Sequence, residues 1–320
     1  MLVALCVYAE AQQPKKVPRI GYVSGTSADN PGPGLTAFRQ GLRDIGYVEG
    51  KNILFEYRYA EDKLDRVPGL VDELVQLKVD VLVVFERRAI IAAKQATKTI
   101  PIVMVTAVDP VATGIIDSLA RPGGNITGLS RLTQELSGKR LELLKETFPT
   151  ISRVGVLWNA TSRGRESGSA AGFKEYEAAA RMLQIQSRSL EVRGPNPDLE
   201  GAFQAAVKGR VNALIIIRGP LLNRYPKQIA DLAIKNRLPS MHEGSENVEA
   251  GGLMSYSSTD AESFRRVAYY VDRILKGAKP ADLPVEQPRK FEFIINLKTA
   301  KQIGLTIPPT VLARADKVIR

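Results

Sequence analysis

Short apolar runs alternate with amphipathic segments along most of the chain. Runs of strand length lie at 20–24, 80–85 and 102–106. Between the first two, the segment 35–45 carries apolar residues three or four positions apart, which is the spacing of a helix. Strands separated by helices of this length predict βαβ units and a parallel sheet.

The same order of segments occurs a second time further along the chain. The run 153–158 begins 134 residues after its counterpart at Arg19, and the run 211–217 begins 132 residues after its counterpart at Val79. Because the segments recur in one order at nearly one offset, the sequence predicts an α/β protein with two similar doubly wound parallel-sheet lobes. A chain of 320 residues is also long enough for two domains of ordinary size.

The end of the chain adds elements to these lobes and does not form a third domain. It contains an extended run at 252–256, an amphipathic segment at 261–276 and another extended run at 291–296. We expect the chain to cross between the lobes near residues 130, 251 and 285, as in a clamshell. The expected boundaries assign 19–130 and 252–284 to the first lobe, and 131–251 and 285–320 to the second.

The N-terminal residues have the pattern of an export signal. Met1 to Ala11 is apolar and ends in Ala-Glu-Ala, the small-x-small pattern that signal peptidase recognises. We therefore expect residues 1–18 to be the remnant of a signal peptide and a leader, and the mature protein to be periplasmic. Cys6, the sole cysteine, lies in this segment, so a mature chain would hold no disulfide and no cysteine-based metal site.

Composition and charge exclude two classes of protein. With 44% hydrophobic and 25% charged residues the chain has the balance of a globular protein, and its apolar runs are far shorter than the roughly 20 residues that span a bilayer. The net charge of +11 comes from basic residues that alternate with acidic ones, as at 139–142 and 262–266. We expect these positions to be solvated helix faces, and the sequence has no pattern typical of nucleic-acid binding.

The residues needed for common kinds of catalysis are missing. The sole histidine, His242, is expected in a loop, and without it no Ser-His or Cys-His pair can form. Clustered His and Cys ligands for a metal are also missing. The stretch 123–128 has two glycines at phosphate-loop spacing, but Leu129 stands where that loop requires a lysine. The sequence therefore predicts no catalytic residue, no metal and no cofactor.

Polar residues follow the predicted strands at their carboxyl ends. Parallel sheets of this type bind ligands at that edge, and two facing sheets would share one site. The candidates are Ser24, Thr26, Glu86, Arg87, Thr106 and Asp109 in the first lobe, Asn159, Arg218 and Glu243 in the second, and Tyr256 on a crossing strand. Such residues supply hydrogen bonds to a small solute without breaking a bond in it. Asp109 precedes Pro110 and would equally suit a helix N-cap.

Several long segments are similar to one family of proteins. They are GLRDIGYVEG at 41–50, SLARPGGNITG at 118–128, LSGKRLELLK at 136–145, GGLMSY at 251–256 and ILKGAKPADLPVEQP at 274–288. Over residues 19–320 the chain resembles the TrpX-like family of ABC-type substrate-binding proteins. The resemblance implies a type I periplasmic-binding-protein fold with three crossover segments. It also implies an exported receptor that delivers its solute to a membrane permease and its ATPase subunit. We expect a monomer that binds a small, amino-acid-like or carboxylate solute.

One turn departs from the pattern of that family. Similar members carry a small, uncharged turn after the strand that ends here at Phe85, whereas this chain has Glu86, Arg87 and Arg88. If these side chains face the cleft, an arginine would pair with a carboxylate and Glu86 with an ammonium, which suits a zwitterionic or acidic solute. If they face outward, they form a charged surface turn. Two other functions stay open: an enzyme on the same scaffold that acts on a small carboxylate, and a cytoplasmic ligand-sensor domain.

Overall fold

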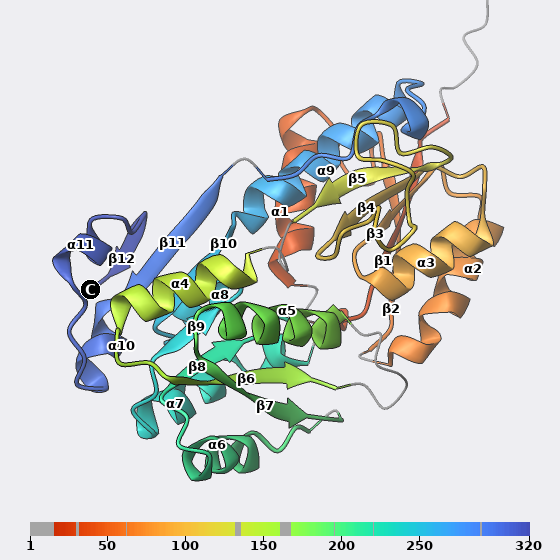
Figure 1. The fold of residues 1–320 in the computed structure, drawn as a ribbon. Coiled ribbons are helices and arrows are strands. Elements are labelled where there is room, and N and C mark those ends of the chain that lie inside the picture. The colour runs from red at the N-terminus through yellow and green to blue at the C-terminus, as the bar shows by residue number, and fades with distance from the viewer. Residues whose placement is uncertain are drawn as a thin grey trace, which may run out of the picture.

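The computed structural model describes residues 16–29, 32–61, 63–131, 136–160, 168–194, 196–219, 221–288 and 290–320. These residues form two α/β lobes, each built on its own sheet (Figure 1). The predicted fold class, two parallel-sheet lobes linked by crossover segments, is confirmed. Residues 1–15 of the expected leader, with Cys6 among them, lie outside the described residues.

The first lobe contains a five-stranded parallel sheet in the order β2-β1-β3-β4-β5. Its strands are β1 (Arg19–Ser24), β2 (Leu54–Tyr59), β3 (Val81–Val84), β4 (Ile102–Thr106) and β5 (Ile126–Ser130). One face packs against α1 (Gly32–Asp44) and α9 (Asp260–Leu275), and the other against α2 (Val67–Gln76) and α3 (Arg87–Ala96). Short 3-10 helices lie at Leu64–Arg66 and Pro280–Asp282. Because helices cover both faces, the central strands β3 and β4 are buried throughout.

The second lobe contains a seven-stranded sheet in the order β12-β11-β10-β9-β8-β6-β7, in which only the β10–β11 pair is antiparallel. Its strands are β6 (Arg153–Asn159), β7 (Gln186–Val192), β8 (Ala213–Ile216), β9 (Ser240–His242), β10 (Met254–Ser258), β11 (Phe291–Asn296) and β12 (Lys317–Ile319). Its helices are α4 (Ser137–Thr147), α5 (Gly168–Met182), α6 (Leu199–Lys208), α7 (Pro226–Lys235), α8 (Ser245–Glu249), α10 (Leu297–Gln302) and α11 (Pro309–Leu312), with a 3-10 helix at Leu222–Arg224.

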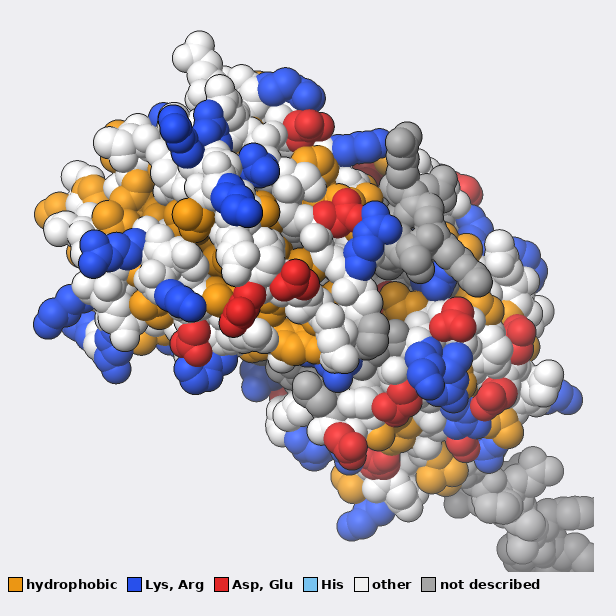
Figure 2. All heavy atoms as spheres, turned by 90° about the horizontal axis from the view of Figure 1, so that it is seen from below, with side chains coloured by type: hydrophobic (Ala, Val, Ile, Leu, Met, Phe, Trp, Pro, Cys, Tyr) orange, Lys and Arg blue, Asp and Glu red, His pale blue; other side chains and the backbone are white. Residues whose placement is uncertain are grey.

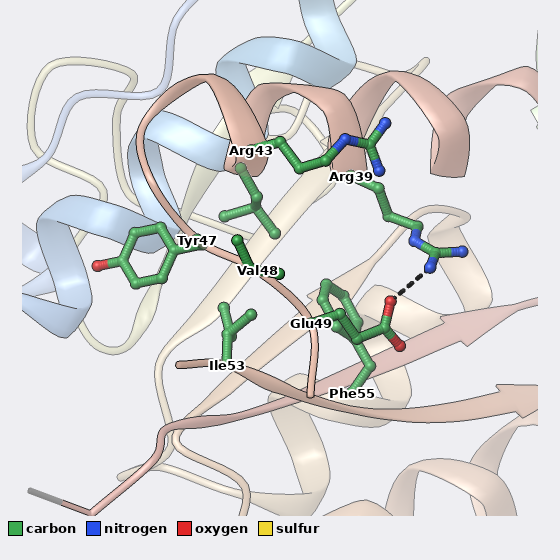
Figure 3. Close-up of a pocket in the computed structure, with 8 residues that line it drawn as sticks. Arg39, Arg43, Tyr47, Val48, Glu49, Ile53 and Phe55 are labelled. Atoms are coloured by element: carbon green, nitrogen blue, oxygen red, sulfur yellow. Dashed lines mark ion pairs between the residues drawn. The ribbon is translucent and has the colours of Figure 1, made fainter. Parts of the chain in front are cut away.

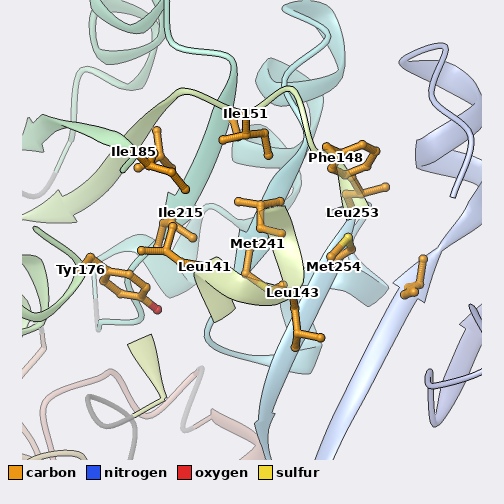
Figure 4. Packing of buried hydrophobic residues seen from close by; sticks show 14 of the residues in the cluster. Leu141, Leu143, Phe148, Ile151, Tyr176, Ile185, Ile215, Met241, Leu253 and Met254 are labelled. Atoms are coloured by element: carbon orange, nitrogen blue, oxygen red, sulfur yellow. The ribbon is translucent and has the colours of Figure 1, made fainter. Parts of the chain in front are cut away.

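The largest hydrophobic core of the second lobe lies between its sheet and the helices α4 and α5. Leu141 from α4, Tyr176 from α5 and Ile215 from β8 point into this interior, where Met241 and Met254 join them (Figure 4). All five side chains are buried. Removing this much apolar surface from water is the main source of stability for such a lobe. It also gives the strand ends a rigid support.

The chain passes between the lobes after Ser130, after Ser258 and after Glu286. The first crossing connects β5 of the first sheet to α4 of the second lobe. The second lies later than predicted, because β10 pairs with β9 and β11 in the second sheet. The expected assignment of the strand near 252–256 to the first lobe was therefore wrong, since an apolar run does not specify which of two sheets it joins. Before the third crossing, the backbone of Glu286 still pairs with that of Gly128 beside β5.

The surface carries mixed charge. On the face shown in Figure 2, Lys and Arg side chains are spread over both lobes with Asp and Glu among them. This agrees with the scattered basic residues of the sequence. None of the helices that the structure describes is long and apolar enough to cross a membrane.

Candidate functional site

The carboxyl ends of the parallel strands in the two lobes face each other. β5 ends at Ser130, from which the chain passes to α4 of the second lobe, and β10 ends at Ser258, from which it passes to α9 of the first. Strands β1, β3 and β4 run parallel to β5, and β6, β8 and β9 run parallel to β10. Their carboxyl ends therefore lie along two edges that border the space between the lobes.

In the first lobe, three predicted residues meet where the strand order reverses. The reversal lies between β1 and β3, and a reversal of this kind leaves a crevice at the carboxyl ends of the strands. Ser24 ends β1, and its Oγ lies 2.8 Å from Oγ1 of Thr26. Glu86 follows β3, and its carboxylate lies against Gly25, where a Cβ atom would be only 2.5 Å from Oε2. Ser24, Thr26 and Glu86 therefore lie together at the carboxyl end of this reversal.

The three charged side chains of the turn after β3, Glu86, Arg87 and Arg88, differ in how far they are buried. Glu86 is half-buried and faces β1, Arg87 is half-buried, and Arg88 is exposed on α3. Burial, the neighbouring Tyr59 and the Glu86 carboxylate all raise the pKa of the Tyr22 hydroxyl well above its ordinary value. The negative charge of Glu86 therefore lies close to the end of β1, and the alternative in which the whole turn points outward does not hold for this residue.

In the second lobe the strand order reverses between β6 and β8, and two predicted residues stand there. Asn159 ends β6 and is half-buried, and Arg218 follows β8. Nη2 of Arg218 lies 2.8 Å from Oε1 of Glu246, and 14% of the Arg218 side chain is exposed. The backbone N–H of Arg218 donates to Oε2 of Glu243 at 2.8 Å. These contacts hold the guanidinium at the carboxyl edge of the sheet.

Glu243, which the sequence predicts to bind the solute, is buried and hydrogen-bonded to other residues of the protein. Its side chain is 3% exposed, and its Oε1 lies 3.3 Å from Nη1 of Arg140 and accepts a hydrogen bond from the Tyr176 hydroxyl at 2.9 Å. Nε of Arg140 in turn donates to the backbone carbonyl of Tyr256 at 2.8 Å. Arg140 was expected on a solvated helix face, which is wrong, because its side chain is 1% exposed.

Thr106 and Asp109 are engaged in their own loop. Thr106 is buried, and its hydroxyl lies 3.2 Å from the backbone nitrogen of Val108, which donates to it. Asp109 is exposed, and its Oδ1 accepts hydrogen bonds from the backbone N–H groups of Val111 and Ala112 at 2.8 and 3.1 Å. Asp109 therefore caps the turn that follows it, as its position before Pro110 allowed.

Aromatic side chains line both carboxyl edges. In the first lobe the half-buried rings of Phe85 and Phe264 lie 5.0 Å apart between centroids, and Phe85 directly precedes Glu86. In the second lobe Tyr256 stacks on Phe291 with centroids 5.8 Å apart. Of these four aromatic residues, only Tyr256 was predicted from the sequence to bind the solute. The other three belong to segments that are far apart in the chain.

A family model described as ABC transporter substrate binding protein matches residues 17–319. The chain belongs to this family. It is 25% identical over 268 residues to a tyrosine-binding protein of Clostridioides difficile (strain R20291), which covers 84% of this chain and 75% of that protein. The predicted family and function are thus confirmed: this solute-binding protein is the receptor component of an ABC importer.

Two solved structures are similar to this solute-binding protein over nearly its whole length. A conserved domain protein from Vibrio cholerae is 28% identical with a TM-score of 0.83, covering 95% of this chain and 100% of that chain. An ABC domain in complex with L-Trp from Streptococcus pneumonia is 25% identical with a TM-score of 0.81, covering 94% and 99%. The shared fold is that of the type I periplasmic binding proteins.

The first of two pockets in the solute-binding protein lies apart from the facing edges, whereas the second borders the carboxyl end of β7. The first, of about 180 Å³, is lined by residues of α1, the loop after it and the start of β2 (Figure 3). Its polar part is the ion pair between Arg39 and Glu49, 2.6 Å apart. The second lies beside β7 and α6. Neither includes a residue predicted for solute binding, so neither belongs to the candidate site.

His242 is a titratable group in the interior of the second lobe. His242 is not in a loop as predicted. It ends β9 and is fully buried, and burial lowers its pKa to about 3, so the imidazole is neutral. Among the described residues, no group of His, Cys, Asp and Glu side chains is arranged to hold a metal ion.

Proposed function

We propose that this solute-binding protein captures an aromatic amino acid between its lobes. Two similar proteins support this ligand class: one is a tyrosine-binding protein and the other was solved with L-Trp. The observation that carries the proposal is the pair of half-buried rings, Phe85 and Phe264, at the carboxyl edge of the first sheet beside Glu86. Aromatic rings prefer offset or edge contacts with other rings, which favours an aromatic solute over an aliphatic one of similar size.

The proposed binding set is narrower than the predicted one. It consists of Ser24, Thr26, Glu86 and Arg87 from the first lobe, and Asn159, Arg218 and Tyr256 from the second. Thr106, Asp109 and Glu243 are left out because their polar atoms hold the protein's own structure. A solute that contacts both lobes stabilises the closed state, because only that state makes both sets of contacts.

The proposed cellular location and partners follow from membership of the family. Receptors of ABC importers work outside the cytoplasm and release their solute to a permease driven by an ATPase, and we propose the same partners and a periplasmic location here. Binding without chemical change is enough for this role. The chain is proposed to act as a monomer, since a single chain supplies both lobes of the site.

Isothermal titration calorimetry and thermal melting with the twenty amino acids test the ligand class. L-Tyr, L-Trp or L-Phe should raise the melting temperature and L-Leu should not, because a ligand bound only by the folded state stabilises it by mass action. Phe85→Leu should weaken aromatic binding about 2- to 10-fold. Phe55→Leu is the matched control, because Phe55 lies near the amino end of β2 and therefore away from the carboxyl edge of the sheet. Equal affinity for leucine and the aromatic amino acids would refute the aromatic assignment.

A further inference from the structure

We infer that Glu86 and Arg218 bind the two charged groups of the solute from opposite lobes: Glu86 the ammonium and Arg218 the carboxylate. This inference rests on the proposed function and adds a requirement to it. The solute must carry both charges, so arylpropionates and arylethylamines are poor ligands. Glu86 stands in the charged turn that follows β3.

Both residues occupy the same place in their lobes. Glu86 follows β3 at the reversal between β1 and β3, and Arg218 follows β8 at the reversal between β6 and β8. The carboxyl edges of the two sheets face each other, because β5 and β10 end where the chain crosses between the lobes. A solute between the lobes therefore meets a negative group on one side and a positive group on the other.

The two groups are held in position before any solute binds. The Glu86 carboxylate fits against Gly25, where a side chain on residue 25 would displace it. Arg218 is held at two points, by its backbone N–H on Glu243 and by its guanidinium on Glu246. The Glu246 carboxylate itself fits against Gly244, which repeats the contact of Glu86 with Gly25. Side chains that are already ordered lose less entropy on binding.

Both groups have the hydrogen-bonding capacity for a solute beside their present partners. A carboxylate offers about four acceptor positions and a guanidinium five N–H donors. A bond between oppositely charged groups is shorter and roughly twice as strong as a neutral one. Closure removes water from both pairs at once, which strengthens their attraction. Loss of either charge on the solute removes one of these two charge-assisted hydrogen bonds from the closed state.

The test measures how the wild-type protein and two variants bind three compounds. The compounds are the aromatic amino acid that binds best, its amide, which lacks the carboxylate, and its des-amino acid, which lacks the ammonium. Wild-type protein should bind both analogues at least about tenfold more weakly than the amino acid. Glu86→Gln should weaken the amino acid about 10- to 100-fold and leave the des-amino acid unchanged. Arg218→Gln should weaken the amino acid similarly and leave the amide unchanged. Arg88→Gln, at an exposed position of α3, is the control and should change nothing.

The outcomes separate this inference from the proposed function. If aromatic amino acids bind and neither variant weakens them, the inference is overturned and the aromatic assignment stands. If each variant weakens all three compounds equally, the effect is structural and the inference is again overturned. If only non-aromatic amino acids bind, with the predicted dependence on Glu86 and Arg218, the charge inference holds and the aromatic assignment fails. Binding of no amino acid would overturn both. The wild-type analogue series depends on no variant, and equal binding of the amino acid, its amide and its des-amino acid would overturn the inference even if a variant misfolds.

Discussion

Nη1 of Arg140 lies 3.3 Å from Oε1 of Glu243, and the two side chains are 1% and 3% exposed. The pair connects α4 with the end of β9, and among the described residues it also forms hydrogen bonds with the Tyr176 hydroxyl and the backbones of Tyr256 and Arg218. A buried ion pair stabilises a protein only where its other polar atoms are satisfied, because both charges have lost water. Here the pair also holds two segments that face the space between the lobes.

Arg140→Met should lower the free energy of unfolding by about 3–5 kcal/mol, because it leaves the Glu243 carboxylate buried without its cation. Arg314→Met is the matched control. Arg314 pairs with Glu146, but those side chains are 45% and 43% exposed, so this loss should be about 1 kcal/mol or less. Urea unfolding of the three proteins measures both. Similar losses for the two variants would show that the buried pair contributes no more than a surface pair.

The contrast between these arginines shows what the sequence can and cannot predict. Apolar runs and their repeat predicted most of the strands and the two lobes, because strand and helix periodicity is local, but β5 and β12 were not predicted. The segment around Arg140 has the same alternation of charges as an exposed helix, and its partner Glu243 is 103 residues away. Likewise, the direction of Glu86 depends on the missing side chain of Gly25, which only the fold brings near. The positions of most strands could therefore be predicted, whereas polar contacts between residues far apart in the chain could not.

Gly25→Ala should weaken solute binding about tenfold with little loss of stability. A Cβ atom at this position would lie 2.5 and 2.6 Å from the Glu86 carboxylate oxygens, so the carboxylate must move. The cost to folding is small because the displaced atoms are the end of a flexible side chain. In a Glu86→Ala background the same substitution should have no further effect on affinity, since interacting positions are not additive. Calorimetric titration of the single and double variants measures this.

Gly69→Ala is the control for that prediction. Gly69 lies in α2, and a Cβ atom there would meet nothing within 4 Å. Alanine is favoured over glycine in a helix by about 0.5–1 kcal/mol, so this variant should be slightly more stable and bind the solute as before. A loss of affinity in Gly69→Ala as large as that in Gly25→Ala would mean that backbone flexibility, and not the contact with Glu86, determines the effect.

The stability of the protein should depend on pH through His242. Burial lowers its folded-state pKa to about 3 from 6.5, so between these values the unfolded chain binds a proton that the folded protein does not. The contribution is complete above about pH 6.5 and is lost as the pH falls, by up to about 1.4 kcal/mol per pH unit. Urea unfolding from pH 4 to 8 should show a shallower dependence in His242→Gln. Identical slopes in the two proteins would mean that folding does not lower the pKa of His242.

Asp109→Ala should lower the free energy of unfolding by about 1 kcal/mol and leave solute affinity unchanged. Its Oδ1 accepts from the N–H groups of Val111 and Ala112, and losing such a cap costs this much. Asp198 caps α6 through the N–H of Gly201, so Asp198→Ala should cost about the same. Asp109→Asn separates capping from charge, because asparagine caps as well as aspartate. If Asp109→Asn keeps full stability but loses affinity in calorimetry, the carboxylate of Asp109 contacts the solute and belongs in the binding set.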